Sequence, residues 1–432
     1  MIEEDLLSLA ERGAAAQAAL IGLTGAERRA ALHAMADALE AARDAILAAN
    51  AEDLAAASGR GRPAVRLARM ELGEARLAGL VRSVRAVADG PDPLGRRESR
   101  WVRPNGLAIE RVRVPLGTVG VCAETRPRLL PVAAAACVKC ADAMVFVSDD
   151  EARATQEALF AALRAGAAAA GVPEDALQMR CEADPRPAAR ALVALEGRID
   201  LALLRGSDAF VRDLVEHASV PVYKHFAGPC HVYVDRDREN PDVPGRPFPT
   251  DLTMALGVIL DARLFEPWEC YAATVALVHR DIAPRLLPLL AAAAAKRGLE
   301  LRADERAAKF LSGARAASPE DFRRTPADLS LAVGVVDGMA EAVARINRDG
   351  AHLSDAIVTG SPDAARDFQR RVDSTTVYAN ASTCFTDGAE FGMAADLGIS
   401  TDKAGPRGAI GPEAFTGLKY VATGDGQTRG GA

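Results

Sequence analysis

The residue best placed for chemistry is a cysteine just before an apolar, β-branched segment. Cys270 follows Pro267, Trp268 and Glu269, and residues 274–278 (Thr-Val-Ala-Leu-Val) predict a buried strand. A thiol in the loop just before a buried strand is held in place by the strand and exposed by the loop. Both conditions favour nucleophilic chemistry. Most cysteines of a cytosolic chain are instead small core residues, so the rest of the sequence must decide between the two roles.

Composition limits the class of protein. The chain has 432 residues, 49% of them hydrophobic and 26% charged, which is typical of a globular protein with two or three domains. The net charge of -7 and the lack of a basic cluster argue against a nucleic-acid partner. The acidic start lacks the basic region of a secretory signal, and charges interrupt every apolar run, so no membrane span is expected. We therefore expect a cytoplasmic protein that acts on a small molecule.

The cysteines indicate a reducing compartment. There are seven at irregular spacing, which is typical of free thiols rather than of a disulfide framework. Cys137 and Cys140 have CxxC spacing, but no second pair accompanies them and the segment is rich in alanine. Helix packing is the favoured interpretation and a zinc site the lesser one, so no metal is predicted. His225 and His231, near Lys224 and Cys230, form too sparse a ligand set to change this.

Secondary-structure patterns predict two α/β domains after a helical start. Residues 1–90 have the three- and four-residue apolar spacing of amphipathic helices. Asn105-Gly106 predicts the turn of a hairpin over 101–114, whose long edge needs a partner to cover it. Short apolar strands alternate with helices from 115 to 234, and again after a proline-rich linker at 235–249, which predicts doubly wound parallel sheets. Such sheets bind ligands at the carboxyl ends of their strands.

Three polar turns could contact a ligand, and each has a structural alternative. Arg205-Gly-Ser207 follows a strand and opens a helix, so it is either a phosphate-binding turn or a plain β–α turn. The segment from Ser148 to Glu151 is best explained as a helix N-cap, and a ribose contact is the alternative, although its acids would repel a 2′-phosphate. Arg407-Gly408 is equally well explained as an anion-binding loop or a surface loop. Neither GxGxxG nor GxxxxGK[ST] occurs.

Nearly the whole chain resembles one family. The motifs that carry the resemblance recur in order, and those of the C-terminal part are the most specific: 115–120, Arg126-Pro127, Lys224-His225, 230–235, Cys270, 346–348, 355–359, 372–374, 380–383, 385–388, 390–392, 398–401, Arg407-Gly408 and Gly424-Asp-Gly-Gln-Thr-Arg429. With these motifs the sequence resembles the gamma-glutamyl phosphate reductases, also called glutamate-5-semialdehyde dehydrogenases, of proline biosynthesis.

The resemblance implies an aldehyde-dehydrogenase-like α/β fold. It implies a Rossmann-type cofactor domain at 1–100 and 115–235 and an α/β catalytic domain at 236–411, whose C-terminal part packs back on the cofactor domain. A small β oligomerisation flap is implied at 101–114 and 412–432, which would make a homodimer or homotetramer. The implied reaction is NADPH-dependent reduction of L-glutamyl 5-phosphate to the 5-semialdehyde through a cysteine thioester, with NAD as a possible substitute for NADP.

The resemblance also implies roles for individual residues. Cys270 is the implied catalytic nucleophile. The implied substrate and oxyanion contacts are Arg126, Arg128, Asn380, Ser382, Thr383 and Arg407. The implied cofactor contacts are Glu124, Thr125, Ser148, Arg205, Gly206 and Ser207.

Several positions depart from the family pattern. Arg128 stands where the family has an oxyanion-donating Asn, and Cys384 where it has Arg. Tyr271, Thr274 and Val275 replace residues that follow the family cysteine. Ser148-Asp149 replaces a Gly-Gly turn, Ser207 replaces the second Gly of Arg-Gly-Gly, and Thr325-Pro326 occupies the place of a Glu expected on the nicotinamide ribose.

Three functional hypotheses are compatible with these departures. The first is a working reductase of the family reaction. The second is a diverged reductase of another acyl phosphate or aldehyde, with a preference for NAD because of Asp149 and Asp150. The third is an inactive family member that acts as a binding or scaffold subunit. Cofactor binding separates the third from the others, and substrate profiling separates the first two.

Overall fold

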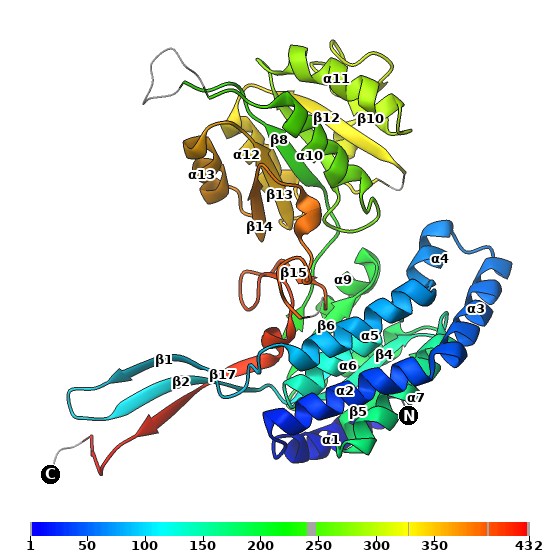
Figure 1. Ribbon diagram of the computed structural model, residues 1–432, viewed down its shortest axis with the longest axis vertical. Coiled ribbons are helices and arrows are strands. Elements are labelled where there is room, and N and C mark those ends of the chain that lie inside the picture. The colour runs from blue at the N-terminus through cyan, green and yellow to red at the C-terminus, as the bar shows by residue number, and fades with distance from the viewer. Residues whose placement is uncertain (1, 240–247, 327, 395–396, 430–432) are drawn as a thin grey trace. The chain divides into compact units, whose positions relative to one another are not determined.

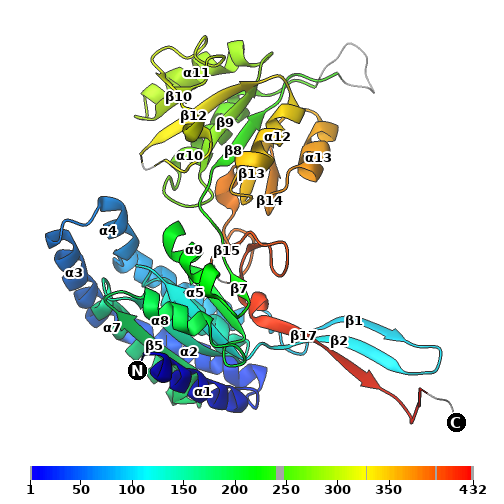
Figure 2. The same cartoon turned by 180° about the vertical axis from the view of Figure 1, so that it is seen from behind.

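The computed structural model describes residues 2–239, 248–326, 328–394 and 397–429, and the chain forms two compact units. Unit 1 comprises Met1–Lys224, Gly392–Ile399 and Ala409–Ala432, and unit 2 comprises His225–Phe391 and Ser400–Gly408. Figures 1 and 2 show the elements of each unit from opposite sides. The segment 235–249, predicted to be a linker, lies largely outside the described residues.

Unit 1 is built on a five-stranded parallel sheet in the order β5-β4-β3-β6-β7. Its central strands are buried along their whole length, because helices cover both faces and the strands are apolar throughout. The strands are β3 (Thr118–Ala123), β4 (Ala143–Asp149), β5 (Leu177–Glu182), β6 (Leu201–Arg205) and β7 (Val222–Tyr223).

Helices lie on both faces of this sheet. On one face α6 packs against α2, α5 and α7, and on the other α1 packs against α8, which contacts α9 (Figures 1 and 2). A capping box of Thr24 and Glu27 starts α2, which satisfies amide groups that would otherwise lack partners. The helices are α1 (Ile2–Leu20), α2 (Gly25–Ala41), α3 (Arg43–Gly59), α4 (Ala64–Met70), α5 (Glu74–Asp89), α6 (Leu129–Lys139), α7 (Arg153–Ala169), α8 (Arg186–Val193) and α9 (Asp208–His217).

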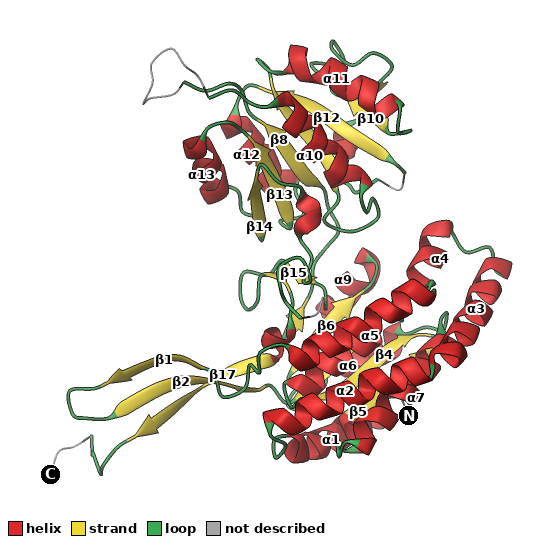
Figure 3. Ribbon diagram, viewed as in Figure 1, coloured by secondary structure: helices red, strands yellow, loops and turns green. Residues whose placement is uncertain are grey.

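A separate antiparallel sheet of three strands extends from unit 1 (Figure 3). It contains β1 (Arg97–Val102), β2 (Ala108–Pro115) and β17 (Thr416–Thr423), with β2 in the middle. The predicted Asn105-Gly106 turn is present, since Gly106 has φ +85° and its N–H bonds to the Arg103 carbonyl at 2.9 Å. We call these three strands the flap.

Unit 2 is built on a seven-stranded parallel sheet in the order β11-β10-β12-β9-β8-β13-β14. The central strands β9 and β12 are buried throughout. The strands are β8 (Cys230–Val234), β9 (Ala273–His279), β10 (Glu300–Ala303), β11 (Arg315–Ala316), β12 (Ser330–Val336), β13 (Ser354–Val358) and β14 (Thr376–Ala379). Two short strands, β15 (Ile399–Ser400) and β16 (Gly408–Ala409), pair in a further sheet.

Two helices cover each face of the second sheet. The core on one face is formed by α10 (Leu252–Leu264) and α11 (Ala283–Ala295), and the core on the other by α12 (Met339–Asp349) and α13 (Pro362–Arg371). Asp251 caps α10 by accepting bonds from the amides of Thr253 and Met254. The sequence pattern predicts a helix over 251–264, and the structure confirms it.

Two sequence-based assignments are wrong. Residues 231–234 were assigned to the cofactor domain, but β8 lies between β9 and β13, and the chain leaves unit 1 after Lys224. An apolar strand of five residues pairs equally well in either parallel sheet, so pattern cannot assign it. Ser148 was expected to cap a helix, but β4 continues to Asp149, and α7 begins at Arg153 after Ala152, whose side chain makes no cap bond.

No helix in the described part of the chain is both long enough and apolar enough to cross a membrane.

Candidate active site

Cys270 lies in the turn that leads into β9. Its residue is half-buried, and the strand that follows is fully buried, so the prediction of a fixed but accessible thiol agrees with the local structure. Because the sheet is parallel, this turn lies beside the first residues of β8 and β13. We call this side of the second sheet the amino edge.

The other six thiols are poor nucleophiles. Cys122, Cys137, Cys140, Cys230 and Cys384 are buried, and Cys181 is half-buried. Burial raises the pKa of every one of them, to about 12 for Cys122 and about 11 for Cys384. A thiol must ionise to attack an electrophile, so Cys270 is the candidate nucleophile of the chain.

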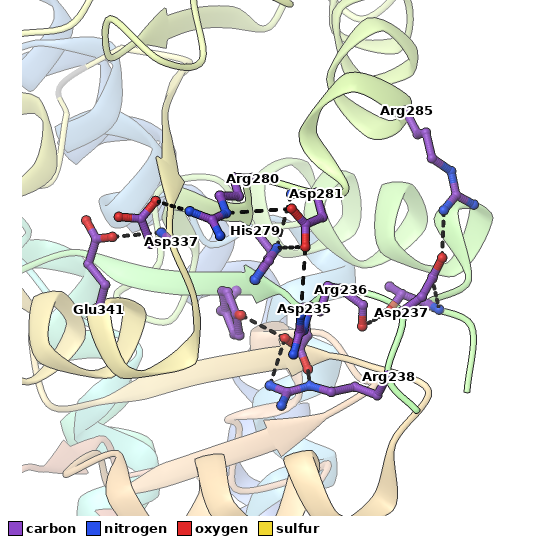
Figure 4. A network of polar contacts seen from close by, with 12 residues as sticks. Asp235, Arg236, Asp237, Arg238, His279, Arg280, Asp281, Arg285, Asp337 and Glu341 are labelled. Carbon is purple, nitrogen blue, oxygen red and sulfur yellow. Dashed lines mark hydrogen bonds and ion pairs between the residues drawn. The ribbon is translucent and has the colours of Figure 1, made fainter. Parts of the chain in front are cut away.

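The opposite side of the second sheet, its carboxyl edge, is occupied by a network of ion pairs (Figure 4). Buried Asp235 accepts hydrogen bonds from Tyr233 at 2.8 Å, Arg238 at 2.7 Å and Thr359 at 3.2 Å. Further pairs join Arg285 to Asp237 at 2.8 Å, Arg280 to Asp337 at 3.5 Å and Arg236 to Asp281 at 3.9 Å. These charges neutralise one another within the network.

Arg407 is brought to the amino edge. Its Nη2 donates to the carbonyl and to Oδ1 of Asp373, at 3.2 and 2.8 Å, just before β14. Lys403 pairs with the same carboxylate at 2.6 Å, and the two cations lower the pKa of Asp373. Two positive charges thus share one carboxylate, so this cluster keeps a positive excess.

Asn380 lies at the carboxyl edge and not beside Cys270. Its Oδ1 accepts from the Thr359 amide at 2.9 Å and its Nδ2 donates to the Thr359 carbonyl at 3.0 Å. Both halves of the side-chain amide therefore hold the end of β14 against the end of β13, and its φ of +58° fits this turn. The structure gives Asn380 an anchoring position rather than the oxyanion position implied by the resemblance.

Ser382 and Thr383 are buried on the path back toward the amino edge. The Ser382 hydroxyl accepts from the Cys384 amide at 3.3 Å and so caps a 3₁₀ turn, while Thr383 Oγ1 has no hydrogen-bond partner among the described residues. The Cys384 thiol lies 3.6 Å from the carbonyls of Asp261 and Ala262 near the end of α10. Of the two predicted hydroxyls, Thr383 retains a free donor.

A cavity of about 200 Å³ opens beside the start of β9. Its lining includes Thr274, Arg302 and Thr325. Arg302 is bound by Asp321 at 2.7 Å and Asp328 at 2.5 Å, whereas the buried Thr274 Oγ1 has no partner among the described residues. The cavity is polar at Thr274, so it is suited to hold water or a polar ligand group.

The carboxyl ends of β3 and β4 are joined in unit 1. Thr125 Oγ1 donates to Asp149 Oδ2 at 2.5 Å and accepts from Arg66 Nη2 at 2.8 Å. Arg66 also pairs with Glu151 at 2.7 Å, and Arg62 pairs with Glu151 at 2.6 Å. Burial raises the pKa of Asp149, whose Oδ1 has no partner among the described residues. This edge is where doubly wound domains bind nucleotides.

The predicted phosphate turn at the end of β6 is partly filled by a carboxylate. Glu124 Oε2 accepts from the Ser207 amide at 2.8 Å, and the Ser207 hydroxyl caps α9 through the Phe210 amide at 3.4 Å. A Cβ on Gly206 would lie 2.6 Å from the Phe210 ring and 3.0 Å from the Glu124 Cβ, so glycine is required there. The Ser207 amide is thus engaged, and two buried donors without a partner among the described residues lie on the neighbouring Arg205.

Arg205 supplies those donors. It ends β6, and neither Nε nor Nη1 has a hydrogen-bond partner among the described residues. Gly398 lies against the guanidinium with φ +122°, and a Cβ there would come within 2.6 Å of Nη1. Both unmet donors are buried, and the positive charge of an arginine at this edge is suited to a phosphate group.

The remaining predicted site residues of unit 1 differ in their exposure to solvent. Arg126 and Arg128 lie, half-buried, in the turn that opens α6, at the positive end of that helix. Ser148 is fully buried and its hydroxyl bonds to Gln156 and to the Asp149 carbonyl, so the cofactor contact implied for it is contradicted. The β4 backbone turns this side chain into the domain rather than toward the edge.

Sequence reasoning missed Arg62 and Arg66, which lie at the carboxyl ends of β3 and β4. They lie in the helical start of the chain, far in sequence from the strands whose ends they reach. The only available signal was the density of arginine at 60–69, and no pattern pairs such a segment with Thr125 or Glu151. The sequence likewise gives no sign that the Cys230 thiol contacts the Cys270 carbonyl, at 3.3 Å.

The fold defines a class of protein. No family model matches the chain. Its fold is shared with an acetylating aldehyde dehydrogenase from Geobacillus thermoglucosidasius, at 17% identity and a TM-score of 0.70 over 99% of this chain and 98% of that one. The chain therefore has the aldehyde-dehydrogenase fold.

Closer relatives narrow the class to a family. The chain is 40% identical over 97% of each sequence to the gamma-glutamyl phosphate reductase of Moorella thermoacetica, and 42% identical to that of Symbiobacterium thermophilum over 98% and 100%. The crystal structure of the Thermotoga maritima enzyme matches with a TM-score of 0.91 at 30% identity, over 98% of this chain and 99% of that one. The chain belongs to the gamma-glutamyl phosphate reductase family.

Proposed function

We propose that this protein reduces L-glutamyl 5-phosphate to L-glutamate 5-semialdehyde with release of phosphate, through a thioester on Cys270. The carrying observation is the half-exposed Cys270 in a chain whose full-length relatives bear the name of this reaction. Six other thiols with raised pKa values leave no second candidate nucleophile.

The covalent steps follow from thiolate chemistry. Cys270 Sγ attacks the acyl carbon, the bond from that carbon to the phosphate oxygen breaks, and phosphate leaves with the electron pair. The thioester that forms accepts a hydride and becomes a thiohemiacetal, which collapses to the aldehyde and regenerates the thiolate. No water is activated in this sequence, so no hydrolytic base is needed. Positive charge such as that of Arg407 and Lys403 favours the anionic species at the amino edge.

The reductant is a nicotinamide dinucleotide, for which unit 1 has suitable residues. When bound, it supplies the hydride. The unmet donors of Arg205 suit its phosphates, and Thr125, Asp149 and Glu124 lie at the same edge. An engineered glycolyl-CoA reductase of this fold, 14% identical over 96% of this chain, was solved with bound NADP⁺.

NADP is the proposed form of the cofactor, and NAD is the alternative. Arg62 and Arg66 place positive charge near the end of β4, which favours a 2′-phosphate. Glu151 neutralises part of that charge, and the buried Asp149 carries an acceptor of the kind that bonds a free 2′-hydroxyl. The ratio of kcat/KM for NADPH and NADH measures which group dominates.

A second copy of this chain is the proposed partner, in a homodimer or homotetramer formed through the flap. Both outer strands of the flap have an open edge within the described sheet. Its large apolar side chains are exposed, by 38% at Trp101, 65% at Tyr420 and 61% at Val102. Exposed apolar strands with open edges are normally covered by another chain.

The reverse reaction tests the proposal. Glutamate semialdehyde, phosphate and NADP⁺ or NAD⁺ are mixed with the protein, and the reduced nicotinamide is followed by absorbance, with Cys270→Ala and Cys181→Ala measured in parallel. A phosphate-dependent signal that persists in Cys181→Ala and vanishes in Cys270→Ala supports the assignment. No signal with either cofactor from the folded wild-type protein would contradict it.

A further inference from the structure

A buried thiol contacts the backbone of the residue that carries the proposed nucleophile. Cys230 is the first residue of β8 and is fully buried, and its Sγ donates to the backbone carbonyl of Cys270 at 3.3 Å. This carbonyl belongs to the residue that carries the reactive sulfur. The contact therefore restrains the peptide on which Cys270 Sγ is mounted.

The strand pairing beside this contact is irregular. Cys230 pairs with Ala273, but His231 pairs with Val275, so Thr274 is an extra residue in β9. A bulge interrupts the ladder and re-aims the chain next to it. The segment that carries Cys270 is thus separated by the bulge from the continuous part of the ladder, and the Cys230 contact ties this segment to the first residue of β8.

The start of β8 is itself anchored. Both the amide and Nδ1 of His231 lie 2.8 Å from Asp355 Oδ1, and Ser374 donates to Asp355 Oδ2 at 2.5 Å. Asp355 is fully buried in β13. Cys230 therefore projects from a fixed strand toward the turn that it supports.

We propose that Cys230 is a positioning residue for Cys270, acting through the hydrogen bond from its thiol to the Cys270 carbonyl. The inference rests on the proposed function of Cys270. Burial raises the pKa of Cys230 well above its usual value, so the thiol keeps its proton and remains a donor at neutral pH. With the donor removed, the turn gains freedom, and the sulfur spends less time in the geometry that attacks an acyl carbon.

Matched variants separate this role from packing. Cys230→Ala removes the donor, Cys230→Ser keeps one, and Cys122→Ala removes an equally buried thiol from β3 of unit 1. The rate of Cys270 alkylation by iodoacetamide is measured against pH by mass spectrometry, beside kcat and KM. We expect Cys230→Ala to lower kcat and the alkylation rate by about tenfold with KM nearly unchanged, Cys230→Ser to restore most of both, and Cys122→Ala to change neither.

Two outcomes would overturn the proposal. The first is a folded Cys230→Ala variant with the alkylation rate and kcat of the wild type. The second is an equal loss of alkylation rate and kcat in Cys230→Ser and Cys230→Ala, which would assign the effect to packing. If Cys230→Ala does not fold, Cys230→Val removes the donor while it retains volume. Alkylation of Cys270 does not require catalytic turnover. The alkylation rate therefore still tests the role of Cys230 if the protein does not catalyse the proposed reaction.

Discussion

The hydroxyl of Thr125 donates a 2.5 Å hydrogen bond to Asp149 Oδ2 and so ties the carboxyl end of β3 to that of β4. Thr125 holds φ at +51°, which is uncommon for a β-branched residue. Conformations of this kind persist where surrounding contacts over-determine them, and they cluster at functional sites. Asp149, Arg66 and Thr125 therefore form a prearranged polar group at the carboxyl ends of β3 and β4.

Removal of the Arg205 guanidinium should weaken cofactor binding. Charge-assisted hydrogen bonds contribute about 1.5–3 kcal/mol, so Arg205→Gln should raise the Kd of NADPH by roughly 10- to 100-fold. Isothermal titration measures this directly. Arg198→Gln, which alters an exposed arginine before the same strand, serves as the control and should bind as the wild type does. Equal affinity of Arg205→Gln and Arg198→Gln would remove Arg205 from the cofactor site.

Limited alkylation should mark Cys270 first. It is half-buried, whereas burial raises the pKa of every other thiol. With substoichiometric iodoacetamide at pH 7.5, peptide mapping should find Cys270 modified before Cys181, the other half-buried cysteine, and before Cys122 and Cys384. Earlier labelling of Cys122 or Cys384 would refute an activated Cys270.

Asp142 should make stability fall as pH rises. It is fully buried, and burial raises its pKa well above the usual value. The folded protein thus keeps a proton that the unfolded chain releases above about pH 4, so stability is present below that pH and is lost as pH rises through the folded-state pKa. Asp142→Asn removes this loss, and its Tm relative to wild type should increase with pH.

An exposed aspartate serves as a control, because its effect on the Tm should change with pH in the opposite direction. Arg29 lowers the pKa of Asp89, so the contribution of Asp89 is present at neutral pH and is lost on acidification. The Tm of Asp89→Asn relative to wild type should therefore increase as pH falls. A difference for Asp142→Asn that is constant across pH would contradict the assignment.

Gly166 marks a close contact between two helices of unit 1. A Cβ there would lie 2.5 Å from the Ala34 carbonyl oxygen and 2.7 Å from the Met35 Cα, where α7 crosses α2. Gly166→Ala should lower stability by about 1–3 kcal/mol, as overpacking does. Gly79→Ala in α5 meets only the Arg82 guanidinium at 3.7 Å and should raise stability by about 0.5–1 kcal/mol. Urea titration compares them, and equal effects would refute the close contact.

The flap should control assembly. Trp101 and Tyr420 make an edge-to-face contact with centroids 6.1 Å apart, and both are exposed. Tyr420→Asp places a charge within this apolar surface and should convert the oligomer to smaller species, as measured by light scattering after gel filtration. Lys419→Gln alters the neighbouring exposed residue and should leave assembly unchanged. A wild-type mass for Tyr420→Asp would exclude the flap from the interface.

Sequence pattern predicted local elements well, because they depend on local signals. The hairpin at Asn105-Gly106, the helix at 251–264 and the buried β9 strand all follow from turn chemistry or from apolar patterns. Assignment of β8 to a sheet failed, since an apolar pentapeptide carries no mark of its neighbours. Pairing partners in parallel sheets are set by long-range packing.

The candidate site also contains features that the sequence predicts and features that it does not. The accessibility of Cys270 could be anticipated from a loop that leads into a strand. The burial of Ser148 and the anchoring of Asn380 could not, because each depends on which way a single side chain faces at the end of a strand. The link from Arg66 to Thr125 joins segments with no shared pattern, so only the folded chain reveals it.

The pairing of β17 with β2 has a consequence for synthesis of the chain. Arg113 donates to Thr416 at 2.9 Å across 303 residues of sequence. On the ribosome, β1 and β2 emerge early, and the open side of β2 must wait until every strand of both large sheets has been translated. A nascent chain stalled before β17 presents an unpaired edge to its neighbours on a polysome. Chaperone demand should therefore be greatest during elongation of the second sheet and should fall when the last strand is released.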